Sequence, residues 1–126
     1  MNIADILEAA ADDITVNGLA QGSIVNKQGQ HCAVGALGYV IGLPMTPQVG
    51  FVTQEDYHNP TLHAAVDVLA RSIPNRCGDR LWIDEWCEVV HWNNTPGRTA
   101  AEVADAMRHA AKDLRNENQI PCNDMP

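Results

Sequence analysis

The sequence predicts a mainly α fold: a compact bundle of four to five helices with one small β-hairpin. Residues 2–17 and 99–116 both place apolar side chains three and four positions apart, which is the spacing of an amphipathic helix. A polar turn over 26–29 separates two short extended pieces, which is typical of a hairpin. A length of 126 residues suits one domain, so we expect a globular unit over 1–116 and a loosely ordered tail over 117–126.

The first helix is expected over residues 2–17. Asn2 can accept a hydrogen bond from the first turn, and Asp5 stands three residues later, as in a capping box. Asn17 and Gly18 favour an end to the helix. The apolar stripe consists of Ile3, Ile6, Leu7, Ala10 and Ile14. This stripe predicts one buried face.

The hairpin is expected over residues 21–32, and it must lean on helices because two strands alone are marginally stable. A second helix over 32–41 contains no charged residue, so we expect it to be buried nearly all round. Gly35 and Gly38 weaken helix formation and are tolerated where another backbone or a ligand approaches closely. Gly42 favours the end of this helix.

Residues 43–58 are expected to form a loop, which is long for a small domain and is therefore a candidate lid or binding loop. Asn59 and Pro60 then begin a third helix, with Asn as the cap and Pro at the first helical position. Pro74 stops that helix, because proline lacks the N–H that a helix interior needs.

A fourth helix is expected over residues 79–91, with a strand over 88–92 as the alternative, because Val-Val-His-Trp also suits a strand. Residues 80–91 are therefore open between helix and partial strand. The last helix begins at a capping box formed by Thr99 and Glu102. Its apolar stripe consists of Val103, Ala106, Met107, Ala110 and Leu114.

The stretch from Trp92 to Thr99 joins an aromatic residue, a tight turn and the start of the last helix. In the first interpretation, Trp92 fills the core and the turn sets the direction of the last helix. In the second, the stretch forms a binding site made of Trp92, Asn93, Asn94 and Arg98. Arg98 bears on this choice, because a cation at the positive end of a helix dipole needs a partner. That partner is either an internal group, such as a carboxylate or carbonyl, or an external anion.

The formal charge is −8, from 16 acidic and 8 basic residues. This balance argues against nucleic-acid binding and against an anionic membrane surface, since both need cations on the protein. The sequence has neither an apolar run long enough to span a bilayer nor the regions of a signal peptide. We therefore expect a cytoplasmic protein whose four cysteines are thiols. It has no glycine pattern of a nucleotide-binding loop, and we expect no cofactor.

Two segments resemble a known group of proteins. Gly29, Cys32, Gly35 and Ala36 form a Gly-x-x-Cys-x-x-Gly-Ala pattern, and residues 92–99 read Trp-Asn-Asn-Thr-Pro-Gly-Arg-Thr. Together they resemble an uncharacterised family of small actinobacterial and bacteriophage proteins, whose second segment is Trp-Asn-Asp-x-Pro-Gly-Arg-Thr. This chain has asparagine at position 94 where that pattern has Asp, which removes a candidate metal ligand or base. The resemblance implies a fold and a phage or prophage source, and it supplies no activity.

Cys32 is the candidate nucleophile, because a helix N-terminus stabilises a thiolate and so lowers the pKa of a thiol. Papain-like hydrolases combine such a cysteine with a histidine and an asparagine, which His91 and Asn93 could supply. The simpler interpretation is a packing residue, since thiols are often buried. An open pocket with His91 near the thiol would favour an enzyme, whereas a thiol sealed in apolar contacts would favour packing.

A zinc site is a further alternative. Cys87 and His91 are four residues apart, so a helix would direct both side chains the same way. His31, Cys32 and Cys77 could complete a tetrahedral set, but the sequence contains no CxxC or HxxxH pair. We therefore expect no metal.

These observations predict a non-enzymatic interaction module, namely a phage or prophage accessory protein that binds a host protein. The alternative is a small cysteine-dependent hydrolase or transferase that uses Cys32. The sequence leaves the identity of the partner and the oligomeric state open.

Overall fold

The computed structural model describes residues 2–73 and 85–119, with the backbone alone for 118 and 119. Over these residues the chain forms five helices of nine or more residues, one single-turn helix and a two-stranded antiparallel sheet. The predicted mainly α fold with a small hairpin is therefore confirmed. No helix in this part of the chain is both long and apolar enough to cross a membrane. The elements are α1 (Ile3–Asn17), α2 (Ala33–Ile41), β1 (Met45–Thr46), β2 (Gly50–Phe51), α3 (Gln54–Tyr57), α4 (Pro60–Arg71), α5 (Glu85–Asn93) and α6 (Ala100–Gln119).

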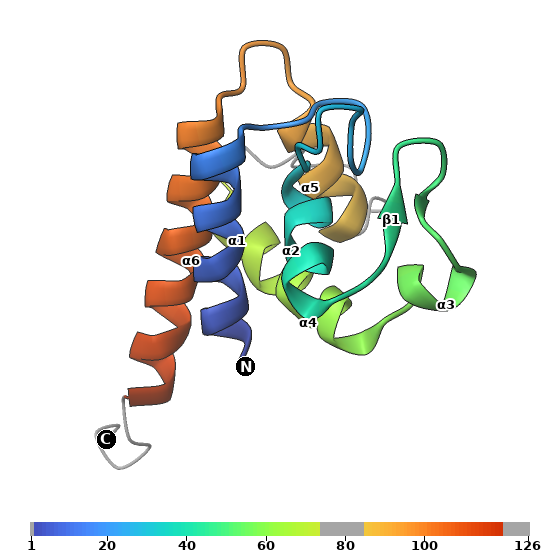
Figure 1. Cartoon of the computed structure of the whole chain (residues 1–126). Helices are drawn as coiled ribbons and strands as arrows, with labels where there is room; N and C mark the ends of the chain where they lie inside the picture. Colours follow the sequence, from blue (N-terminus) through green and yellow to red (C-terminus); the bar gives the residue numbers. More distant parts are fainter. Residues whose placement is uncertain (1, 74–84, 120–126) are drawn as a thin grey trace.

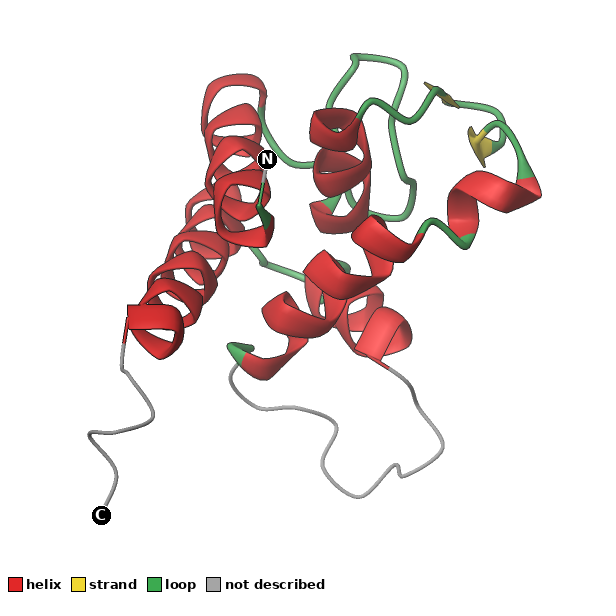
Figure 2. Ribbon diagram, turned by 90° about the horizontal axis from the view of Figure 1, so that it is seen from below, coloured by secondary structure: helices red, strands yellow, loops and turns green. Residues whose placement is uncertain are grey.

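α1 and α6 lie antiparallel along one side of the molecule, with α2, α4 and α5 beside them (Figure 1). The two strands and α3 lie at the opposite side from this pair (Figure 2). The core is formed where the apolar faces of α1, α2, α4 and α6 meet, and its centre is fully buried at Leu7, Leu37, Leu62 and Met107. The apolar stripes predicted for the first and last helices therefore face each other across one core.

The predicted helix caps are confirmed. The Asn2 side chain accepts a hydrogen bond from the Asp5 N–H at 2.8 Å, and the Asn59 side chain accepts one from the Leu62 N–H at 3.0 Å. Gly18 ends α1 with a φ of +96°, a conformation that residues with a Cβ rarely adopt. These local signals fix where α1 and α4 begin and where α1 ends.

The position predicted for the hairpin is wrong. The turn over 26–29 exists and is closed by the Asn26 N–H donating to the Gln30 carbonyl at 3.0 Å. Its flanks make only two isolated bridges, Leu19 to His31 and Val25 to His31, and no strand. Residues before the turn are held instead by the residue that follows α5, because the Gly22 N–H donates to the Asn94 side chain at 2.9 Å.

The two-stranded sheet lies in the segment predicted as a loop over 43–58. Met45 pairs with Phe51 and Thr46 pairs with Gly50. Phe51 is 2% exposed and packs so closely on α2 that a Cβ at Gly38 would lie 2.4 Å from its ring. The sheet is therefore stabilised by one buried aromatic ring against a glycine of α2, as expected of a glycine at a close approach.

Residues 88–92 are helical and do not form a strand, because α5 runs from Glu85 to Asn93. The expected cap at Asp79 and the first residues of that predicted helix lie outside the described residues. The last helix continues to Gln119, beyond the expected end at 116, and residues 120–126 of the expected tail are not described.

Candidate functional site

The turn between α5 and α6 reverses the chain through a set of local hydrogen bonds. The Thr95 hydroxyl donates to the His91 carbonyl at 3.1 Å, and the Arg98 N–H donates to the Thr95 carbonyl at 3.0 Å. Gly97 sits in the turn with a φ of +85°, where a side chain would be strained. The turn predicted from Pro96 and Gly97 in the sequence is thus present in the structure.

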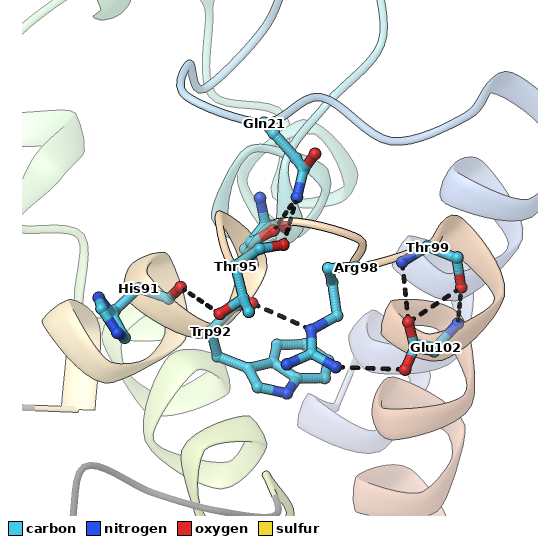
Figure 3. Close-up of polar contacts among 8 residues, drawn as sticks. Gln21, His91, Trp92, Thr95, Arg98, Thr99 and Glu102 are labelled. Carbon is cyan, nitrogen blue, oxygen red and sulfur yellow. Dashed lines mark hydrogen bonds and ion pairs between the residues drawn. The ribbon is translucent and has the colours of Figure 1, made fainter.

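Arg98 contacts Trp92 and Glu102 of its own fold (Figure 3). Its guanidinium carbon lies 4.6 Å from the centre of the Trp92 ring, and its Nε donates to the Trp92 carbonyl at 3.1 Å. One terminal nitrogen donates to the Glu102 carboxylate at 3.2 Å. Both the carbonyl and the acidic partner that a helix-terminal cation needs are therefore internal. Trp92 itself is 6% exposed and joins the core, as the first interpretation predicts.

Glu102 and Thr99 form the predicted capping box. The Thr99 hydroxyl accepts from the Glu102 N–H at 3.2 Å, and the Glu102 carboxylate accepts from the Thr99 N–H at 3.0 Å. The Thr99 N–H holds the pKa of Glu102 below its ordinary value, and the Thr99 hydroxyl and the Arg98 charge lower it further. The start of α6 is thus fixed by a charged hydrogen-bond network.

Asn93 connects three segments that are far apart in the sequence. Its side-chain oxygen accepts from the Ala33 N–H at 2.8 Å, and its amide nitrogen donates to the Ala20 carbonyl at 3.0 Å. The same nitrogen donates to the Asn94 side chain, which in turn holds Gly22. Asn93 is 1% exposed, and its side-chain polar atoms are hydrogen-bonded inside the fold. The hydrogen bonds of Asn93 and Asn94 therefore serve the scaffold.

A cavity of about 220 Å³ opens beside this network. Buried Cys32 and Asn93 lie at its inner end, and exposed Gly22 and Asn94 lie at its rim. Its lining residues are Gly22, Ser23, Ile24, Cys32, Val34, Trp86, Val90, Asn93 and Asn94. Most of this lining is apolar, so the cavity is suited to an apolar group entering from the rim.

The expectation of a lowered thiol pKa at Cys32 is wrong. Cys32 does stand at the start of α2, where its sulfur accepts a hydrogen bond from the Gly35 N–H at 3.3 Å. Burial, however, raises the pKa of the Cys32 thiol, and the hydrogen bonds from the nearby backbone only partly offset this rise. The side chain is 5% exposed and belongs to the core cluster. The sulfur therefore acts as a helix cap.

The structure brings Cys32 and Asn93 to one cavity but places His91 elsewhere. His91 is exposed and is absent from the cavity lining. Its ring points away from Trp92 and Arg98 in Figure 3. The side-chain atoms of Asn93 are already bonded to Ala20 and Ala33. A nucleophile, base and orienting amide in one chain of hydrogen bonds is thus not formed by these residues.

The residues considered for zinc are also apart. His31 is buried and its Nδ1 lies 2.9 Å from an Asp13 carboxylate oxygen, while Cys87 and His91 are exposed on α5. Cys77 lies outside the described residues. Within residues 2–73 and 85–119, no group of three or more His, Cys, Asp or Glu side chains could hold a metal ion.

Sequence reasoning missed two features of this region. Trp86 and Val90 line the cavity with Asn93 one turn later; their four-residue spacing predicts a common helix face, but it does not predict a cavity there. The buried pair of Asp13 and His31 had no such signal, because its members are 18 residues apart and no local pattern joins them.

A family model described as "Family of unknown function (DUF6197)" matches residues 1–113 of the chain. The matched range contains both the segment around Cys32 and the stretch from Trp92 to Thr99. No curated protein and no solved structure gives a significant match.

Proposed function

We propose that this chain, which belongs to the family of unknown function DUF6197, is a non-enzymatic interaction module. The observation that carries the proposal is the cavity between α5, the start of α2 and residues 22–24. Its lining is mostly apolar, and the side chains of Asn93 and Asn94 are already hydrogen-bonded within the fold. In this proposal the cavity receives one apolar side chain of a partner protein.

A cavity of this kind matches the way in which protein interfaces gain most of their affinity. A few apolar or aromatic anchors fill pockets near the centre of an interface, and a polar rim excludes water around them. Here exposed Asn94 supplies a polar group at the rim, while Ile24, Val34 and Val90 supply apolar lining. The bound Asn94 side chain gives the rim a fixed shape before any partner arrives.

The cysteine-dependent hydrolase or transferase has weaker support from the same region. A nucleophilic cysteine must be a thiolate, which needs a lowered pKa and an adjacent base. Cys32 has a raised pKa, caps α2 with its sulfur and has His91 outside its cavity. A binding role uses the cavity as it stands, without any rearrangement of Cys32.

Two observations indicate the kind of partner. The net charge of −8 favours a partner with a basic surface around its anchor, because opposite charges speed encounter and reject wrong partners. The resemblance of two segments to small bacteriophage proteins is the reason for proposing a protein of a bacterial host. A phage or prophage accessory role in the host cytoplasm is part of this proposal.

The experiment compares two variants that add the same large side chain at different places. Ser23→Trp fills the cavity, whereas Thr61→Trp adds an exposed ring at the start of α4, away from it. Both variants and the unchanged chain are immobilised, and proteins captured from host lysate are identified by mass spectrometry and tested again as purified components. Thermal unfolding first verifies that both variants fold.

The proposal requires a partner that binds the unchanged chain and Thr61→Trp equally and loses at least about tenfold in affinity with Ser23→Trp, the scale of one lost anchor. A partner that binds Ser23→Trp as tightly as the unchanged chain would place its binding surface elsewhere. Turnover of any substrate that disappears in Cys32→Ser would contradict the non-enzymatic role.

A further inference from the structure

A second cavity, of about 400 Å³, is lined by Val25 and His31 on either side of the turn at 26–29, by the end of α2 and by residues 42–45. Its lining is apolar at Val25, Leu43, Pro44 and Met45, and it also includes Tyr39 and His31. Small-molecule sites in proteins have volumes of about 300–1,000 Å³, mostly apolar walls and few polar groups. By volume and lining, this cavity has the character of such a site.

His31 is the buried polar residue of this lining, and it is held firmly. Its side chain is 8% exposed, that of Asp13 is 6% exposed, and Nδ1 lies 2.9 Å from the Asp13 carboxylate. The other carboxylate oxygen of Asp13 accepts from the Asn17 side chain at 2.9 Å. The His31 ring also stacks on Tyr39 with a centroid distance of 4.8 Å. The imidazole is thus fixed in position before any ligand binds.

The second ring nitrogen of His31 is unused. In the described part of the chain Nε2 has no hydrogen-bond partner, and it is not among the buried unpartnered atoms there, which are the Asp56 Oδ2 and the Trp92 Nε1. Solvent therefore reaches Nε2, on a side chain that lines the cavity. Because a carboxylate oxygen accepts, Nδ1 carries a hydrogen, and in the neutral imidazole Nε2 is then an acceptor.

We propose that this cavity binds a small, largely apolar compound that carries a hydroxyl group, and that the hydroxyl donates its hydrogen bond to His31 Nε2. A histidine that only tied residue 31 to α1 would need Nδ1 alone, and the residue would not have to line a cavity. The net charge of −8 disfavours an anionic ligand and favours a neutral donor. The site is separate from the cavity at Cys32, so the inference stands independently of the proposed interaction module.

The test uses p-cresol and toluene, which differ only in the hydroxyl group. Each is titrated into the full chain labelled with ¹⁵N, and binding is followed by chemical shifts of backbone amides and of the His31 ring nitrogens. We expect shifts around Val25, Leu43 and Met45, a shift of Nε2 with p-cresol, and a Kd for p-cresol at least about fivefold lower than for toluene, the scale of one hydrogen bond.

His31→Phe keeps a ring that can stack on Tyr39 and removes Nε2. In this variant p-cresol and toluene should bind with equal Kd, whereas Asn94→Ala, at the other cavity, should keep the preference of the unchanged chain. If His31→Phe does not fold, the Nε2 shift and the map of shifted amides in the unchanged chain decide the question.

Three results would overturn the proposal. The first is equal binding of the two probes, or no binding of either up to their solubility. The second is a p-cresol preference that survives in His31→Phe. The third is a set of shifts centred on Trp86 and Val90, which would place the probes in the cavity at Cys32.

Discussion

Asn93 shows how one buried side chain can organise a small fold. It accepts from the first turn of α2, donates to the segment after α1, and itself ends α5. A buried amide is stable only when its groups are paired, and a fully paired one specifies a single arrangement of its neighbours. The residue proposed from sequence as part of a site is thus an internal connector at the base of a cavity.

We predict that Asn93→Ala is strongly destabilising. The change leaves the Ala33 N–H and the Ala20 carbonyl without their partners, and each lost partner costs about 1–3 kcal/mol in a buried place. The expected loss in the free energy of unfolding is therefore about 2–6 kcal/mol, measured by urea denaturation. Asn94→Ala, at the exposed neighbour, should cost about 1 kcal/mol or less. Equal losses for the two variants would contradict the connecting role.

Cys32 should be a slow thiol at neutral pH. Its raised pKa lowers the thiolate fraction, and its 5% exposure restricts access of a reagent. In a variant with Ser at positions 77, 87 and 122, we expect Ellman's reagent to react at pH 7 at least about tenfold more slowly with the native chain than with the chain in urea. The native rate should still be rising with pH where an ordinary thiol has levelled off. A native rate faster than that in urea would support the alternative of a cysteine-dependent hydrolase or transferase.

At the scale of single residues, the sequence pointed to the turn over 92–99 and left open whether its residues stabilise the core or form a site. Trp92, Asn93 and Arg98 all lie at a structurally decisive turn. Their partners divide into near and distant ones. Arg98 finds Glu102 within one helical turn, so an internal partner could be predicted, whereas Asn93 finds Ala33 at a separation of 60 residues, which no local pattern encodes.

At the scale of elements, caps and spacing predicted the helices well, and turn chemistry predicted the hairpin poorly. A helix start depends on a few neighbouring residues, as at Asn2 and Thr99. A strand pair depends on hydrogen bonds between two segments on either side of a turn. Strands β1 and β2 have two residues each, too few for an alternating pattern to be visible, and Phe51 is fixed by α2 instead.

The capping box at the start of α6 gives a prediction with a defined pH dependence. The folded-state pKa of Glu102 is lowered, so its charged form is favoured by the native state over the unfolded chain. That stabilisation is present above the unfolded pKa of about 4.3 and is lost as pH falls through the lower folded value. Glu102→Gln keeps the acceptor for the Thr99 N–H and removes the charge.

We therefore expect a higher urea midpoint for the unchanged chain than for Glu102→Gln at pH 7. The difference should narrow as pH falls from about 5 to about 3, where the carboxylate takes up its proton. Because the group is exposed, high salt should also narrow the difference at pH 7. A difference that grows on acidification would show that the charge of Glu102 opposes folding.

At the scale of the whole molecule, the first and last helices pack against each other. The apolar faces of α1 and α6 are joined in the core, and Arg115 on α6 pairs with Asp5 at 2.7 Å and with Glu8 at 2.5 Å. These ion pairs are largely exposed and contribute little, so the pairing of the two helices rests on burial. Each helix buries a large part of its apolar stripe against the other, which couples the two ends of the chain in folding.

This coupling predicts how the molecule opens. Amides of the buried residues of α1 and of residues 103–111 in α6 should exchange with solvent only through global unfolding, with the same free energy and the same dependence on urea, because these residues face the shared core. The sheet has only two residue pairs and α3 has no buried residue, so amides of residues 45–57 should exchange at least about 100-fold faster through local opening. Hydrogen exchange followed by mass spectrometry at increasing urea distinguishes the two classes. If residues 45–57 were protected as strongly as α6, the packing of Phe51 on Gly38 would join the sheet to the same cooperative unit as the helices. Local opening of residues 45–57, separate from the helical core, would then be contradicted.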